Sequence, residues 1–190
     1  MKNGDLIKRI HRALCKANKK YYKWTNGWSL ADSGVEGFMV SEIANSIMRK
    51  PELDSNLVLT LETPLGYIHE NQGKSKNSRQ KKSTRKQKRV DIALHKENTK
   101  VENVTHVIEV KRKWRKKECL QDIDELRSLL QDYSKKSGKG SIIACIFVLW
   151  CKQNTIKKHK DKMEEFLNKK RPIIKFKFCV SDNSLCLLME

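Results

Sequence analysis

Two short segments carry acidic and basic side chains at a spacing that could bind a metal ion. The first is 89–94 (RVDIAL), with Asp91, and the second is 107–111 (VIEVK), with Glu109 and Lys111. Both read as strands, because β-branched and apolar residues alternate along them. Side chains alternate across a strand, so Glu109 and Lys111 should share one face. Two acids and a lysine buried together cost free energy unless a partner offsets it, and a divalent metal ion between the acids would do so.

These residues resemble the PD-(D/E)xK nuclease superfamily, which includes many restriction endonucleases, resolvases and repair nucleases. Asp91 stands for the first acid of the family and residues 109–111 for its E-x-K tripeptide, whereas Val90 stands where many members have proline. The resemblance covers roughly residues 35–150 in pattern. It implies an α/β fold with a restriction endonuclease-like core, in the order αβββαβ, whose mixed central sheet is flanked by helices.

The resemblance also implies an activity, that of a metal-dependent endonuclease that hydrolyses phosphodiester bonds; DNA is the expected substrate because most of the superfamily acts on it, and RNA is the alternative. Mg²⁺ is the expected cofactor, with Mn²⁺ as a substitute, because Mg²⁺ binds through one or two carboxylates plus waters and phosphates. Asp91, Glu109 and the carbonyl of Val110 would bind the ion. Lys111 would place the attacking water and stabilise the developing charge, since a role as the base would require a lowered pKa.

Many members of the superfamily draw a further glutamate from the first core helix, and this chain offers Glu36 and Glu42 there. Glu36 lies in line with Val40, Ile43 and Ile47 at helical spacing, so we expect it on the inward face. Glu42 lies well round the helix and should be solvated. Glu36 is therefore the candidate, and its alternative role is that of an acid favoured at a helix start by the macrodipole.

The strand that holds Glu109 and Lys111 is followed by a helix in which Gln121 is a secondary candidate for a position near the scissile phosphate. Asp124, one turn on, is expected to be ordinary helix surface. The alternative for Asp91, Glu109 and Lys111 is an ion-pair patch on an edge strand, which a lysine-rich chain could form without any catalytic role.

The charge of the chain points to a polyanionic partner. Its 41 Lys and Arg against 22 Asp and Glu give a formal net charge of +19, which favours nucleic acid over a membrane surface. Between residues 73 and 89 there are nine Lys or Arg and no acid, in a stretch too poor in apolar residues to fold by itself. This stretch is either a solvated flexible insertion or a mobile arm that contacts the phosphate backbone.

A second basic run, residues 112–117, follows the strand of Lys111 directly and could clamp phosphate. Trp114 within it could stack on an unpaired base or pack on the domain. The residues predicted to bind nucleic acid are Lys81, Lys82, Arg85, Lys86, Lys88, Arg89, Arg112, Lys113, Trp114 and Arg115.

Apolar periodicity predicts the elements that must position these side chains. Helices are expected at 3–24, 35–49, 117–134 and 156–169, and strands at 57–61, around Asp91, at 104–111 and at 142–150, with a terminal hairpin at 173–179 and 185–189. The continuous apolar run at 142–150 predicts an internal strand covered on both faces. We expect an N-terminal helix and loop at 1–34, and a nuclease-like domain at 35–190 with a basic flexible insertion at 70–89.

Six cysteines form no C-x-x-C pair and lie mostly in apolar runs, which indicates reduced thiols in a cytoplasmic protein. The longest apolar run, 142–151, is too short to span a bilayer, and no signal peptide is recognised. Two alternatives to the nuclease stay open: a nucleic-acid-binding protein that does not cut, and a nuclease subunit that needs a partner. Association as a homodimer or with a partner protein is compatible with both.

Overall fold

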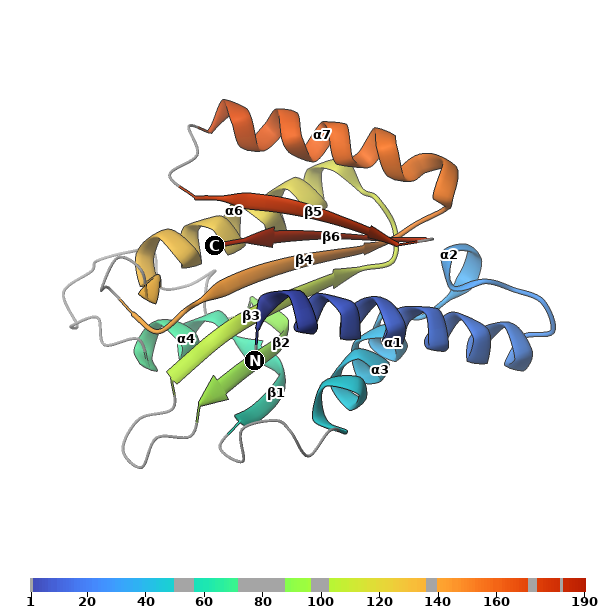
Figure 1. Cartoon of the computed structure of the whole chain (residues 1–190), viewed down its shortest axis with the longest axis horizontal. Coiled ribbons are helices and arrows are strands. Elements are labelled where there is room, and N and C mark those ends of the chain that lie inside the picture. Colours follow the sequence, from blue (N-terminus) through green and yellow to red (C-terminus); the bar gives the residue numbers. More distant parts are fainter. Residues whose placement is uncertain are drawn as a thin grey trace.

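A six-stranded mixed β-sheet forms the centre of the molecule, with helices on both of its faces (Figure 1). The computed structural model describes residues 2–49, 57–71, 88–96, 103–135, 140–170, 174–181 and 183–190. The strands are β1 (Leu57–Pro64), β2 (Arg89–Lys96), β3 (Asn103–Lys111), β4 (Ala144–Trp150), β5 (Phe176–Ser181) and β6 (Ser184–Met189).

The strands lie in the order β1-β2-β3-β4-β6-β5. The β3–β4 pair is parallel, and every other neighbouring pair is antiparallel. All seven residues of β4 are buried, so the prediction of an internal strand covered on both faces is confirmed. β2 and β3 are internal as well, which contradicts the alternative that placed the acids on an edge strand.

One face of the sheet is covered by α1 (Asn3–Trp24) and α3 (Glu36–Met48), with the short α2 (Leu30–Ser33) between them. Leu6, Ile10 and Leu14 recur at helical spacing along α1 and are fully buried. They pack in one cluster with Ile92 of β2 and Ile108 of β3. α1 therefore contributes directly to the layer that covers the sheet.

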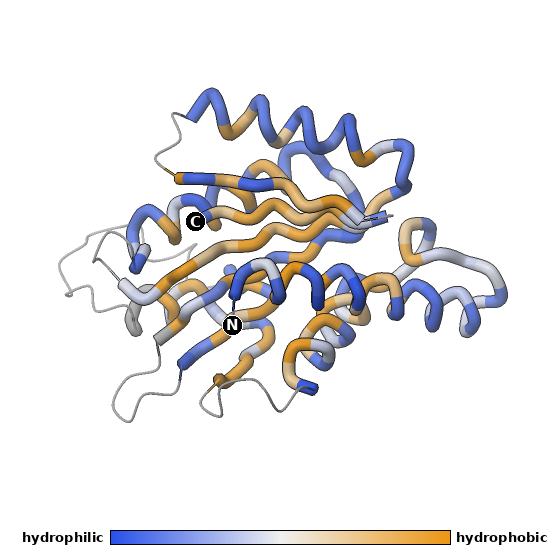
Figure 2. The backbone as a smooth tube through the Cα atoms, in the orientation of Figure 1, coloured by the Kyte–Doolittle hydropathy of each residue, from blue (hydrophilic) through white to orange (hydrophobic). Residues whose placement is uncertain are grey.

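The opposite face is covered by α4 (Leu65–Asn71), α6 (Lys116–Tyr133) and α7 (Ile156–Lys169), the last of which follows the one-turn 3₁₀ helix η2 (Gln153–Thr155). Ile123 and Leu130 of α6 and Met163 of α7 pack against Val107 and Phe147 of the sheet. Figure 2 shows the polar sides of α1 and α7 turned away from the sheet and the apolar central strands between the helical layers.

The helices and strands predicted from periodicity are present with ends shifted by a few residues. The stretch after β1, predicted as a long basic loop, begins instead with α4, and residues 72–87 lie outside the described part of the chain. No helix among the described residues is long and apolar enough to cross a membrane. All six cysteines are free thiols, four of them buried, as their sequence context predicts.

Candidate active site

The strands β2 and β3 stop pairing through their main chains at the position of Asp91. Their ladder runs from Lys96↔Asn103 to Ile92↔Ile108. One step further on, the backbone N–H of Val110 donates to Asp91 Oδ2 at 2.6 Å. The N–H and C=O of a strand residue point toward the same neighbour, so the Val110 carbonyl is directed toward β2 as well. The Asp91 carboxylate thus accepts the Val110 N–H at the point where the main-chain hydrogen bonds of the ladder end.

Continuing the same register places Asp91 opposite Glu109, and the two carboxyl groups affect each other's protonation. Glu109 is only 8% exposed. Burial, and next to it the charge of Asp91, raise the pKa of Glu109 to about 8. Burial also raises the pKa of Asp91 to about 6, against the opposing effects of the Val110 N–H and Lys111. Both shifts favour the protonated forms, first because burial disfavours a charge and, for Glu109, next because Asp91 is close.

Lys111 lies among three carboxylates contributed by three elements. Its Nζ is 2.6 Å from Glu109 Oε1, 3.4 Å from an oxygen of Asp122 on α6 and 3.8 Å from an oxygen of Glu36 on α3. Burial alone would lower the pKa of Lys111, but these acids, Glu109 first, raise it above its ordinary value. Lys111 is therefore a cation throughout the neutral range, which argues against a role as the base.

Glu36 reaches this group from the first residue of α3, where its negative charge also suits the helix dipole. Its second carboxylate oxygen accepts the backbone N–H of Arg112 at 3.0 Å, and 41% of its side chain is exposed. Glu42 points elsewhere: it pairs with Lys20 of α1 at 2.6 Å, with 14% of its side chain exposed. The prediction that Glu42 is solvated is wrong, because α1 covers that side of α3.

Two further acids at the site were not predicted. Asp122 contacts both Lys111 and Lys88, each at 3.4 Å, and 13% of its side chain is exposed. Glu62 of β1 lies between the residues that pair with Ile92 and Val90, and is thus opposite Asp91, whose pKa its charge helps to raise. Glu62 has a φ of 51°, a conformation uncommon for a residue with a side chain.

Gln121 and Asp124 occupy the outer side of α6. Gln121 Nε2 donates to Glu125 Oε1 at 3.3 Å in an exposed position. Asp124 pairs with Arg127 at 3.1 Å and with Lys170 at 3.3 Å, in keeping with helix surface. The α6 residue that contacts Lys111 is the intervening Asp122.

The predicted nucleic-acid-binding residues fall into three groups. Lys88 pairs with Asp122 and Glu125 at the site, and Arg112 donates to the carbonyl of Asp32 at 3.3 Å. Trp114 stacks on His159 of α7 with ring centroids 5.0 Å apart, so the alternative in which it packs on the domain describes its position. Exposed positions are held by Arg89, Lys113 and Arg115, while Lys81, Lys82, Arg85 and Lys86 lie outside the described residues.

The donor set of Asp91 and Glu109 fits a hard divalent cation. Within the described ranges no three His, Cys, Asp or Glu side chains gather closely enough to hold a metal ion. Mg²⁺ does not need three, since it binds through one or two carboxylates and keeps water ligands. Burial is the first cause of the raised pKa of both acids, and a bound cation would stabilise their charged forms. Asp91, Glu109 and the Val110 carbonyl are the groups that could hold it.

The chain matches no protein-family model, no curated protein and no solved structure. What can be said of its chemistry therefore depends on the geometry of these residues.

Proposed function

We propose that this protein is a metal-dependent nuclease of the PD-(D/E)xK type, built on a restriction endonuclease-like core, with DNA as its substrate because most of that superfamily acts on DNA. The observation that carries the proposal is the convergence of Asp91, Glu109 and Lys111 at the point where β2 and β3 separate. Apart from the inserted α4 between β1 and β2, the order of α3, three strands, α6 and β4 agrees with the αβββαβ pattern that the resemblance implies.

The protein's own groups have distinct roles in this mechanism. Asp91 and Glu109 supply the carboxylates that hold the cation, and the Val110 N–H fixes the orientation of Asp91. Lys111, kept protonated by its acidic neighbours, is suited to bind a non-bridging phosphate oxygen and to stabilise the charge that builds there. A bound Mg²⁺ supplies an activated water and neutralises charge on the phosphate.

The surroundings of the site suit a polyanion. Arg112 and Lys113 follow Lys111 directly, and Arg89 and Lys88 lie at the start of β2 beside Asp91. Phosphate contacts of this kind position a nucleic acid without reading its sequence. The basic stretch at 73–89 enters β2 directly before Asp91, so any strand it contacts would be brought to the site.

The decisive experiment is cleavage of supercoiled plasmid, single-stranded DNA and RNA with Mg²⁺ or Mn²⁺, beside EDTA. Asp91→Asn and Lys111→Met should each reduce the rate by about 10²–10³-fold or more, the loss typical of a preorganised charge-stabilising group. The matched controls Asp161→Asn and Lys157→Ala remove the same charges from α7 and should cut normally. Cleavage that persists in EDTA, or in both site variants, would refute the proposal.

The alternatives give different results in the same assay. Salt-sensitive binding without cutting, unchanged in the site variants, would assign the chain to the non-cleaving nucleic-acid-binding proteins. Cutting that appears only after addition of another protein would assign it as a partner-dependent subunit. The acids at the site favour the nuclease, since binding to a polyanion alone gains nothing from the buried Asp91 and Glu109 or from the carboxylates that pair with Lys111.

A further inference from the structure

Three aromatic rings are exposed within seven residues at the end of α1 and in the turn that follows. Tyr22 is 55% exposed, Trp24 69% and Trp28 59%. Tryptophan and tyrosine carry large apolar areas that surfaces seldom leave in water without a binding role. The ring of Trp24 also lies 5.2 Å from that of Phe38 on α3, so the exposed surface continues onto the start of α3.

The turn that presents these rings is held by several hydrogen bonds. Thr25 Oγ1 donates to the carbonyl oxygens of Tyr21 and Trp28, at 2.8 Å and 3.0 Å. Asn26 and Gly27 adopt positive φ values of 54° and 111°, which reverse the chain after α1. Tyr22, Trp24, Trp28 and this turn are called the aromatic platform. Because hydrogen bonds fix the turn, the platform loses little conformational entropy when a ligand stacks on it.

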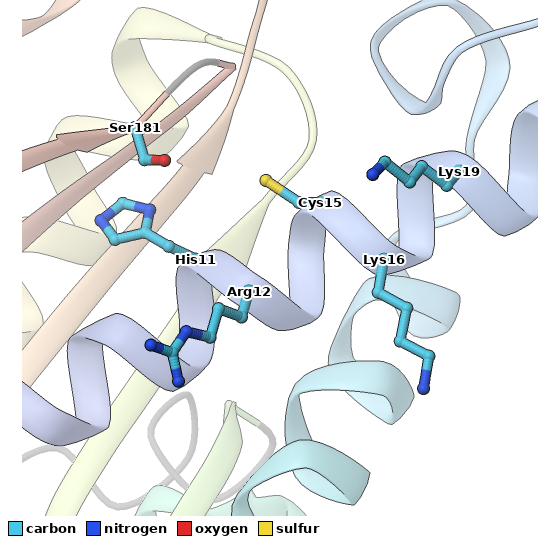
Figure 3. Close-up of a pocket in the computed structure, with 6 residues that line it drawn as sticks. All are labelled: His11, Arg12, Cys15, Lys16, Lys19 and Ser181. Atoms are coloured by element: carbon cyan, nitrogen blue, oxygen red, sulfur yellow. The ribbon is translucent and has the colours of Figure 1, made fainter.

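A stripe of exposed cations runs along α1 to this platform. Arg12, Lys16, Lys19 and Lys23 are spaced four, three and four residues apart, which places them along one side of a helix over about 16 Å. No acid occurs between residues 6 and 31. Figure 3 shows three of these cations beside His11 and Cys15, around a pocket closed on its other side by Ser181 of β5.

The platform is connected to the candidate active site through α2 and the start of α3. Asp32 of α2 accepts a hydrogen bond from Arg112 on its carbonyl and pairs with Lys152 through its side chain. Glu36, which contacts Lys111, lies two residues before Phe38. In Figure 1, α2 and the end of α1 lie at the end of the sheet where the chain leaves β4.

We infer that α1 and the turn after it form a binding surface for single-stranded nucleic acid, in which Tyr22, Trp24 and Trp28 stack on unpaired bases. The stripe Arg12, Lys16, Lys19 and Lys23 binds the phosphates of the same strand. Positive charge interleaved with exposed aromatic rings matches the backbone and the base faces of an unpaired strand, whereas a duplex keeps its base faces covered. The biological setting of this surface rests on the proposed function, in which the substrate of the nuclease has an unpaired segment next to the scissile bond.

The test is binding of the full chain to a fluorescein-labelled oligo(dT) of about 20 nucleotides, longer than the usual site on such a surface, and to a duplex of the same length. EDTA is present throughout, so the measurement does not depend on cleavage. Trp24→Ala/Trp28→Ala should weaken oligo(dT) binding by about tenfold or more, because stacking contributes about 5- to 100-fold per base. Duplex affinity should change by less than about threefold.

Two matched variants separate stacking from general damage. Trp24→Phe/Trp28→Phe keeps the rings and should restore most of the affinity. Met48→Ala removes an exposed apolar side chain from the far end of α3 and should have no effect. Unchanged oligo(dT) binding in the double alanine variant, with its fold intact by circular dichroism, would overturn the inference.

The outcomes also separate this inference from the proposed nuclease. Tryptophan-dependent binding without metal-dependent cleavage would uphold the surface and reject the nuclease. Metal-dependent cleavage, with oligo(dT) binding that is insensitive to both tryptophans, would uphold the nuclease and reject the surface. Self-association lost in the double alanine variant would assign the rings to a second copy of the chain. Tryptophan-dependent binding to vesicles of phosphatidylcholine and phosphatidylserine, without oligo(dT) binding, would assign them to a lipid surface. Either of these last two results would overturn the inference.

Discussion

Replacing Asp91 by asparagine should stabilise the protein in the absence of divalent ions. The asparagine Oδ1 can still accept the Val110 N–H, while the negative charge opposite Glu109 disappears. The pKa of Asp91 is raised from its ordinary 3.8 to about 6. At 1.36 kcal/mol per pKa unit, the charged form costs about 3 kcal/mol of folding free energy at neutral pH. Coupling to Glu109 and partial contact with solvent reduce this, so we expect a gain of about 1–2 kcal/mol, or about 2–8 °C in Tm.

The pH dependence of the gain identifies its cause. Below pH 3.8 the Asp91 carboxyl is protonated in both the folded and unfolded chains, so it does not affect stability. The cost appears as the pH rises above this unfolded-state value and is complete above the folded-state value near 6. Urea denaturation in EDTA should therefore show wild type and Asp91→Asn converging toward pH 4 and separating as the pH rises through 6, with a further increase toward pH 8 because the charge of Asp91 also raises the pKa of Glu109.

Asp161→Asn serves as the control, because it removes an acid from the exposed side of α7. It should give no comparable gain and no comparable pH dependence. If Asp91→Asn lowered the stability at pH 7.5, or if its gain were the same at every pH, the cost assigned to the buried charge of Asp91 would be contradicted.

Three further predictions concern the ion, the core and the lysine. Mg²⁺ at tenfold its Kd should stabilise the wild type by about 1.4 kcal/mol in a thermal melt, EDTA should reverse this, and Asp91→Asn should show no such response. Leu14→Ala should lower the free energy of unfolding by about 2–4 kcal/mol in urea, whereas Lys8→Ala should change it by less than about 0.5, since only Leu14 is buried. Asp122→Asn should lower kcat for cleavage by about 10-fold with little change in KM, because Lys111 loses a carboxylate that fixes its position; an unchanged kcat would contradict this.

The secondary structure was predictable because burial leaves a local periodic record in the sequence. The stripe on α1 reflects contacts with the sheet, and the unbroken apolar run of β4 reflects the helices that cover both faces of that sheet. Alternation along β3 likewise placed Glu109 and Lys111 on one face. α4 was missed because it is short and precedes a stretch of basic residues that dominates the composition.

The acids that complete the site were harder to find for two different reasons. Asp122 follows the buried Cys119 by three residues and precedes the buried Leu126 by four, so a signal existed: an acid inside an apolar stripe. Gln121 lies off that stripe. Glu62 gave no such signal, because its position depends on a positive φ that a sequence pattern does not encode.

The exposed aromatic rings show the same limit of prediction from a sequence pattern. An apolar residue in a sequence is ordinarily assigned to the core, and only the fold reveals which rings find no cover. Trp114 and Trp150 do find it, one on His159 and one within the sheet, whereas Trp24 and Trp28 remain in solvent. Exposure, not residue type, separates a ring that stabilises the domain from one available to a ligand.

The contacts of Lys111 indicate how a phosphate would enter the site. An ammonium group has three protons: Glu109 accepts a hydrogen bond from Lys111, while Asp122 and Glu36 make longer ion pairs with it. A phosphate oxygen must displace one of these carboxylates. Glu36 makes the longest contact, at 3.8 Å, and is the most exposed of the three, so its contact costs least to break. Glu36 would stay in place through its bond from the Arg112 N–H, while Glu109 and Asp122 continue to hold Lys111. In the proposed mechanism, the exposed side of the lysine, toward α3, is therefore the side from which a phosphate would reach it.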